Sequence, residues 1–152
     1  MQREQTKQIR RGVSWALCLV CMALIFYFSS RTAAQSIEQS GNVLLALEKI
    51  LGQTLTSFAV RKGAHFAEYA GLGFLFANAL YQSGKKHWGI WAAVLTSLYA
   101  ITDEVHQLFV EGRACQFTDW LLDTAGGIAG AALFLALLLL LRLIAERTKH
   151  AA

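Results

Sequence analysis

Four long apolar stretches restrict the folds that are open to this chain more than any other feature. They cover residues 13–30, about 64–81, about 88–110 and about 119–141. Each is close to the ~20 residues that a helix needs to cross ~30 Å of hydrocarbon. Because no water reaches the backbone in lipid, such stretches must be helical. We therefore predict an all-α integral membrane protein built as a bundle of four transmembrane helices.

The overall composition favours a membrane protein. Of the 152 residues, 55% are hydrophobic and 16% are charged, whereas soluble domains usually carry about 25% charged residues. The net charge is +4, but the basic residues lie at the ends of the apolar stretches and no nucleic-acid-binding motif is present. We expect membrane lipid as a partner, no nucleic acid and no cofactor. The oligomeric state is not predicted.

The positions of Lys and Arg predict the orientation in the membrane. Most of them lie in the amino-terminal tail, in the loop after the second stretch and in the carboxyl-terminal tail. The side with more basic residues is usually cytoplasmic. Both termini are therefore expected inside the bacterial cytoplasmic membrane, with a basic tail over 1–12, a multi-pass membrane domain over 13–145 and a second tail over 146–152. A cleaved signal peptide is an alternative for the first stretch, because Arg10-Arg11 precede it and Thr32-Ala33-Ala34 follow it.

Residues 40–58 have a different pattern. One side of a helix would hold the apolar residues Val43, Leu44, Leu47, Ile50, Leu51 and Leu55, and the other Glu48, Lys49, Gln53 and Thr54. This periodicity predicts an amphipathic helix between the first two spans, lying on the outer membrane surface or packed on the bundle.

Half of the acidic residues lie inside the apolar stretches or at their ends. They are Glu68, Asp103, Glu104, Asp119 and Asp123. A charge near the bilayer centre costs at least ~2.5–3.5 kcal/mol, so such residues need a partner, a proton or a function. In the predicted topology all five lie within ~10–12 Å of the outer interface. We therefore expect one polar cluster at the extracytoplasmic face.

The last stretch also carries a helix-packing pattern. Asp119, Asp123, Gly126 and Gly130 share one helix face, and the spacing of the two glycines lets helices approach closely. The acidic face of this helix is therefore expected to point into the bundle.

Three motifs resemble those of the VanZ-like family. The first is RKGAHFAEY at 61–69, the second is DEVHQLF at 103–109 followed by Gly112-Arg113, and the third comprises Asp119, Asp123 and Gly126. Together they cover about 60–130. Glu111 stands where the family pattern usually has a proline, and an asparagine is common at the position of Asp123. The resemblance implies a small bacterial membrane protein with a cell-envelope role, reduced susceptibility to teicoplanin-type glycopeptides being the expected phenotype.

The same residues suggest an acid–base enzyme of the outer leaflet, although the sequence leaves open whether the chain is an enzyme. His65 would be the base, Glu68 would orient it, and Asp103 or Glu104 would be the acid. The candidate binding residues, for a phosphate of a lipid-linked cell-wall precursor or a phospholipid, are Lys62, Gln107, Arg113, Asp119 and Asp123.

Several alternatives remain at this point. Structural ion pairs would join Lys62 or Arg61 to Glu68, and Arg113 to Asp119 or Asp103. A buried acid chain could also relay protons or hold a cation in a small transporter. Metal-ligand types occur in His65, Glu68, His106, Asp103 and Asp119, but no dense ligand signature is present, so no metal site is expected. Cys18 and Cys21 are expected to be packing residues, and Cys115 is not expected to be a nucleophile.

Overall fold

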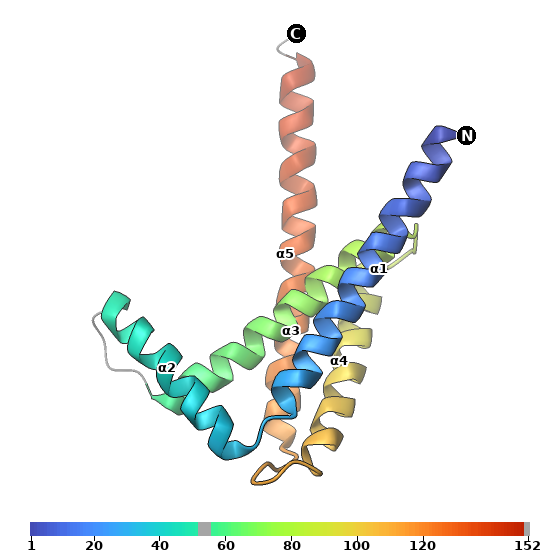
Figure 1. The fold of residues 1–152 in the computed structure, drawn as a ribbon. Helices are drawn as coiled ribbons and strands as arrows, with labels where there is room; N and C mark the ends of the chain where they lie inside the picture. Colours follow the sequence, from blue (N-terminus) through green and yellow to red (C-terminus); the bar gives the residue numbers. More distant parts are fainter. Residues whose placement is uncertain (52–55, 151–152) are drawn as a thin grey trace.

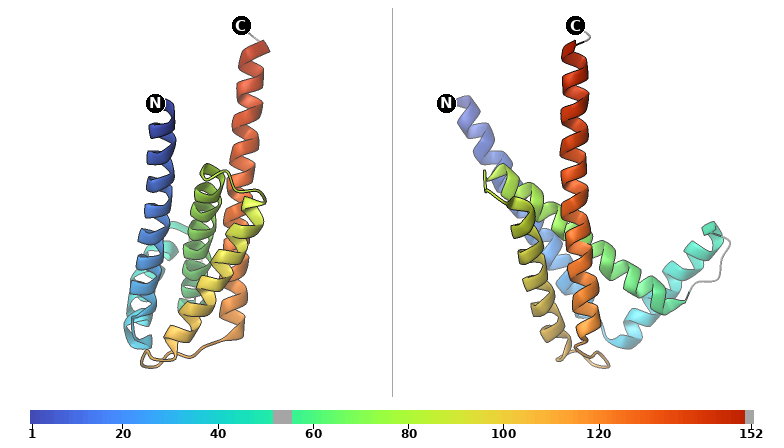
Figure 2. Two further views of the ribbon diagram at one scale, coloured as in Figure 1. Left: turned by 90° about the vertical axis from the view of Figure 1, so that its right-hand side faces the viewer. Right: turned by 180° about the vertical axis from the view of Figure 1, so that it is seen from behind.

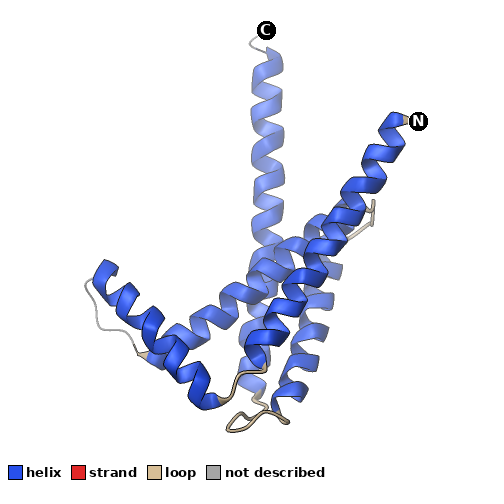
Figure 3. Cartoon of the chain, viewed as in Figure 1, coloured by secondary structure: helices blue, strands red, loops and turns tan. Residues whose placement is uncertain are grey.

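The computed structural model describes residues 1–51 and 56–150, and helices are the only regular secondary structure within them (Figure 3). The helices are α1 (Gln2–Ser29), α2 (Ala33–Leu51), α3 (Ser57–Gln82), α4 (Trp88–Gln107) and α5 (Phe117–His150). The predicted all-α class is confirmed. The ends of α1 and α5 that hold the two termini project at the same end of the bundle (Figure 1).

Two of the described helices, α1 and α5, are long and apolar enough to cross a membrane. Only 22% of the most apolar window of α1 and 17% of that of α5 is buried in the protein. The core helix of a soluble protein would be mostly buried, whereas these helices expose rows of Leu, Val and Phe side chains. Apolar surface of this extent is suited to lipid.

Helix α3 lies at the centre of the molecule and packs against each of the other four helices. Its buried side chains include Tyr69, Leu72 and Phe76. Helices α4 and α5 pack on α3 and on each other, while α1 packs on α3 and α4 (Figures 1 and 2). Helix α2 contacts α3, so the segment between the first and third helices folds back onto the bundle.

Glycines bring α5 into backbone contact with its neighbours. A Cβ atom at Gly126 would lie 2.6 Å from the carbonyl oxygen of Phe66 on α3, and one at Gly130 would overlap the carbonyl oxygen of Ala70. Gly127 lies against the side chain of Thr96 on α4. Because these contacts leave no room for side chains, they fix the position of α5 relative to α3 and α4.

The predicted boundaries of the helix over 40–58 are wrong. Helix α2 begins at Ala33, and Ser57 already belongs to α3. The cause of the early start is a reciprocal cap: the Thr32 hydroxyl accepts from the Gln35 amide at 3.3 Å, and the Gln35 side chain accepts from the Thr32 amide at 3.2 Å. Most side chains of the predicted apolar face, including Leu44, Leu47, Ile50, Leu51 and Leu55, lie outside the described residues.

The α1–α2 linker and the α4–α5 loop are joined at one end of the bundle. The amide of Ala33 donates to the carbonyl of Glu111 at 3.1 Å. The Nε of Arg113 donates to the carbonyl of Arg31, also at 3.1 Å. The third predicted stretch extended to residue 110, but α4 ends at Gln107, and a turn with Gly112 at a φ of 72° follows.

Candidate functional site

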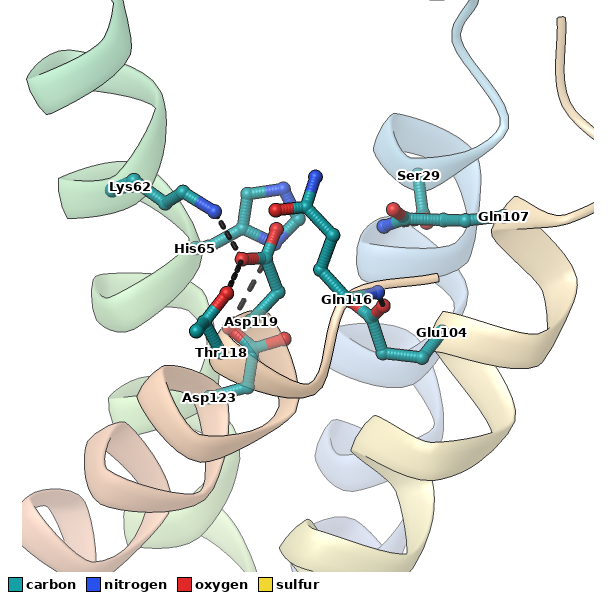
Figure 4. Close-up of polar contacts among 9 residues, drawn as sticks. All are labelled: Ser29, Lys62, His65, Glu104, Gln107, Gln116, Thr118, Asp119 and Asp123. Carbon is teal, nitrogen blue, oxygen red and sulfur yellow. Dashed lines mark hydrogen bonds and ion pairs between the residues drawn. The ribbon is translucent and has the colours of Figure 1, made fainter. Parts of the chain in front are cut away.

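An ion pair joins the first turns of α3 and α5. The Nζ of Lys62 donates to Oδ1 of Asp119, and the hydroxyl of Thr118 donates to the same oxygen at 3.3 Å (Figure 4). The exposed fractions of the Lys62 and Asp119 side chains are 20% and 17%. The pair is therefore shielded enough from water to matter for the alignment of the two helices.

A second contact lies one turn deeper. Nδ1 of His65 is 3.8 Å from Oδ1 of Asp123, whose side chain is fully buried. Asp103 of α4 is 3% exposed, and one of its carboxylate oxygens belongs to the same group. One ligand atom each from His65, Asp103 and Asp123 can be chosen so that all lie within 4.8 Å of one another. Three helices thus bring a histidine and two carboxylates to one point.

Two cavities open at this end of the bundle. The larger one has a volume of about 220 Å³ and lies between α1, α2 and α3, and the smaller one has about 120 Å³ and reaches the α4–α5 loop. Arg61, His65 and Arg113 line both. Glu68 lines the larger cavity, whereas Lys62, Gln107 and Asp119 line the smaller one.

Two predicted site residues of α4 have separate contacts. Glu104 accepts a hydrogen bond from the backbone amide of Gln116 at 2.6 Å and faces the cleft between α4 and the start of α5. Gln107 donates to the hydroxyl of Ser29 at 3.1 Å (Figure 4). The structure therefore groups His65 with Glu68 at one cavity and with Asp103 at the buried point, but it does not bring Glu104 to either cavity.

The model of the VanZ/LLP1 family matches residues 14–142, most of the chain. The chain belongs to the VanZ/LLP1 family. No curated protein and no solved structure gave a match. The matched region begins within α1 and ends within α5, so it includes part of both candidate membrane spans and every residue of the site.

The ion pairs expected from the sequence differ from those of this VanZ/LLP1 chain. Lys62 pairs with Asp119 and not with Glu68, and Arg113 donates to a backbone carbonyl. The reason is geometric, because the glycine contacts place the first turn of α5 directly beside that of α3. The short spacing between Lys62 and Glu68 on α3 favours a local ion pair, but the packing of α5 on α3 places Asp119 against Lys62 instead.

The polar face of α2 was not identified from the sequence, and Arg61 was not identified as a cavity-lining residue. Ser36 and Ser40, both buried, and Gln39 line the larger cavity together with Arg61. Their spacing of three and four residues is a helical polar face, and the Thr32–Gln35 capping pattern was the signal that would have found the start of the helix.

Two positive charges approach each other in the cavities. Burial of the Arg113 guanidinium, followed by the charge of Arg61, lowers the pKa of Arg113. Among the described residues, neither arginine forms an ion pair with a carboxylate. Guanidinium groups of this kind are chemically suited to pair with carboxylate or phosphate groups.

Cys115 lies in the α4–α5 loop and is exposed. Desolvation of the thiol, followed by the charge of Glu104, raises the pKa of Cys115. A thiol with a raised pKa is protonated at neutral pH and is a weak nucleophile. This property argues against covalent catalysis by Cys115.

Proposed function

We propose that this protein crosses the bacterial cytoplasmic membrane four times, through α1, α3, α4 and α5, and that it binds the phosphorylated headgroup of an envelope lipid at its extracytoplasmic end. Both termini are then cytoplasmic, and the cavities between α1, α2 and α3 lie near the outer headgroups. The observation that carries the proposal is the pair of guanidinium groups, Arg61 and Arg113, on the walls of the same two cavities.

The charge balance of the cavities favours an anionic ligand. Lys62 is already neutralised by Asp119, so that pair contributes little net charge. Arg61 and Arg113 remain, with Glu68 as the nearby acid of the larger cavity. Guanidinium groups bind phosphate through paired N–H···O bonds and are preferred where phosphate recognition matters.

The size of the cavity favours a headgroup over a whole lipid. The larger cavity has about 220 Å³, whereas pockets for drug-sized ligands have roughly 300–1,000 Å³. A phosphate or diphosphate with a few attached atoms fits such a space, and acyl or prenyl chains would remain outside. The exposed apolar faces of α1 and α5 would contact those chains in the bilayer.

The cellular role that follows is in the cell envelope. Lipid-linked cell-wall precursors carry their phosphates at the membrane surface, and glycopeptides act on such precursors outside the membrane. A VanZ/LLP1 protein that binds these headgroups would lower susceptibility to teicoplanin-type antibiotics by changing the supply or accessibility of their target.

The experiment measures binding of polyprenyl phosphate, phosphatidic acid and phosphatidylcholine to the purified protein in detergent. We expect selective binding of the two phosphomonoesters and at least a tenfold loss in both Arg61→Gln and Arg113→Gln. Arg31→Gln is the matched control, because the Arg31 guanidinium lies over the ring of Tyr27 and lines neither cavity. Equal binding by the double variant Arg61→Gln/Arg113→Gln would refute phosphate recognition at this site.

The cellular part of the proposal is tested by teicoplanin susceptibility. Cells that express the wild-type chain should be less susceptible than cells that express Arg61→Gln/Arg113→Gln, at matched protein levels. Equal teicoplanin susceptibility of the two strains would show that the two arginines have no role in resistance.

A second function, an acid–base enzyme of the outer leaflet, is favoured by one observation. His65 and Glu68 line the same cavity as the two arginines, so a base and an acid lie beside the proposed phosphate site. Turnover of lipid precursors by membranes that contain His65→Gln tests this function. A rate equal to that of the wild type would exclude His65 as a catalytic residue.

A further inference from the structure

The buried group of His65, Asp103 and Asp123 has a composition that the anion site does not explain. One ligand atom of each can be chosen so that the three lie within 4.8 Å of one another, and the three residues come from α3, α4 and α5. The Asp103 and Asp123 side chains are 3% and 0% exposed. Two acids at this depth are unusual because burial strongly disfavours an uncompensated carboxylate.

Five buried polar atoms of this group lack a hydrogen-bond partner within the part of the chain that the structure describes. Both oxygens of Asp103, both oxygens of Asp123 and Nδ1 of His65 are buried and lack a hydrogen-bond partner. Buried polar groups in proteins are almost always paired, so this set of unpaired acceptors needs a donor or a positive charge. The buried hydroxyl of Tyr69 lies beside Asp103, but it carries one proton and so can serve only one of the four carboxylate oxygens. The ligand atoms are thus available and already close together.

Among the described residues, no lysine or arginine forms an ion pair with Asp103 or Asp123. The ammonium of Lys62 lies against Asp119, and the Nε of Arg113 donates to the carbonyl of Arg31. His65 can supply at most one positive charge, and its Nδ1 is 3.8 Å from Asp123, beyond hydrogen-bond distance. A protein cation that balances both aspartates is therefore absent from the described contacts.

From these observations we propose that His65, Asp103 and Asp123 bind a divalent transition metal ion. One imidazole nitrogen and two carboxylate oxygens suit Zn²⁺ or Mn²⁺, whereas Mg²⁺ and Ca²⁺ prefer oxygen ligands alone. Three protein ligands leave at least one coordination position for water or another ligand, as in catalytic rather than structural zinc sites. A metal ion supplies the missing charge and links three helices at one point.

The site also has a defined relation to the cavities. His65 lines both of them, so the ion would lie behind the cavity wall that carries Arg61 and Arg113. A consequence, which rests on the proposed function, is that the ion adds positive charge to the phosphate site. Metal binding itself does not depend on that function.

The first experiment determines the metal content of the full-length protein purified in detergent without chelator. Elemental analysis should find about one Zn²⁺ or Mn²⁺ per chain. After stripping with EDTA, titration with ZnCl₂ or MnCl₂ should restore one equivalent and raise the melting temperature. A stripped wild-type protein that binds neither ion at millimolar concentration would overturn the proposal.

The second experiment uses variants of matched shape. Asp103→Asn, Asp123→Asn and His65→Gln should each lower metal affinity at least tenfold. Glu111→Gln is the control, because it removes an acidic side chain that is exposed in the α4–α5 loop. It should keep the full metal content. Equal metal affinity in all four variants would also overturn the proposal.

The melting temperature of the metal-free proteins distinguishes loss of a ligand from misfolding. Metal-free Asp123→Asn should melt at or above the temperature of the stripped wild type, because the substitution removes one of two unpaired carboxylates. If the wild type is metal-free as purified and refuses both ions, the two aspartates share a proton instead, and the metal site is refuted. Lipid binding measured in EDTA reports on Arg61 and Arg113 separately, so the two proposals can fail independently.

Discussion

The two ends of the helix bundle differ in how far their charged side chains are shielded from water. At the end that holds the cavities, Lys62 and Asp119 form a shielded ion pair and Asp103 and Asp123 are buried. At the other end, Lys7 and Glu4 also form an ion pair, but their side chains are 65% and 72% exposed. The residue types are similar, and only the surroundings differ.

This difference separates two uses of charge in a membrane protein. Exposed basic residues near the amino terminus and in the α3–α4 turn remain solvated without a buried partner, and basic residues of this kind orient membrane proteins in general. Buried charges are costly, so they persist where they align helices or bind something. In the proposed topology and function, the exposed charges at one end orient the chain and the buried charges at the other end serve ligand binding.

The comparison fails if the two ends do not face opposite sides of the membrane. A membrane-impermeant maleimide applied to intact cells should label the exposed Cys115 of the α4–α5 loop, and Cys115→Ser should abolish the signal. In the Cys115→Ser background, Lys86→Cys should label only after the membrane is opened. Labelling of Lys86→Cys in intact cells, with Cys115 labelled only after the membrane is opened, would show that the topology is opposite to the proposed one.

The rate of this labelling has a predicted pH dependence. The thiolate reacts with the maleimide, and the pKa of Cys115 is raised, so less thiolate is present at neutral pH than for a free cysteine. Labelling should therefore be slow at pH 7 and accelerate roughly tenfold for each pH unit below the pKa. A rate already saturated at pH 7 would contradict the raised pKa.

The contact that aligns the site can be tested by substituting a single glycine. Gly130→Ala places a methyl group against the carbonyl of Ala70 and should lower the free energy of unfolding by about 2–3 kcal/mol. Gly71→Ala is the matched control, because its Cβ would have no neighbour within 4 Å, and it should stabilise α3 by about 0.5–1 kcal/mol. Thermal unfolding in detergent measures both, and equal effects would show that α5 is not held by close backbone contact.

The two ion pairs provide the most direct comparison of the ends, with the smallest expected effect. Asp119→Asn leaves Lys62 without its partner in a shielded position and should cost about 1–2 kcal/mol of unfolding free energy. Glu4→Gln, the equivalent change in the exposed pair, should leave the melting temperature unchanged. If both variants behave alike, the shielding of the Lys62–Asp119 pair has no energetic consequence.

Periodicity in the sequence was sufficient to predict features that depend on one helix at a time. It placed Asp119, Asp123, Gly126 and Gly130 on one face of α5, and the glycines of this face do contact α3. It could not choose the partner of Lys62, because Glu68 and Asp119 differ only in tertiary distance. The close approach of His65, Asp103 and Asp123 depends on the packing of three helices and leaves no short-range spacing to recognise.

Errors in the sequence reading had a local cause. The residues around Thr32 also fit a cleavage site, an alternative that the sequence leaves open, and the helix predicted over 40–58 begins too late to include the cap and Ser36. For Arg61 the sequence offers a family motif and a structural pairing with Glu68, but not a cavity-lining role, because a position facing a cavity cannot be distinguished from one facing solvent without the fold.

The turn after α4 explains how this chain accommodates Glu111 where a proline is usual. The amide of Arg113 donates to the carbonyl of Val110, which makes Glu111 and Gly112 the central residues of a four-residue turn with a positive φ at Gly112. Proline is favoured at the first central position of such turns and glycine at the second. The contact that Glu111 makes with Ala33 uses only its main-chain carbonyl, an atom that every amino acid supplies. The hydrogen bond that joins the two loops therefore does not depend on which side chain stands at position 111.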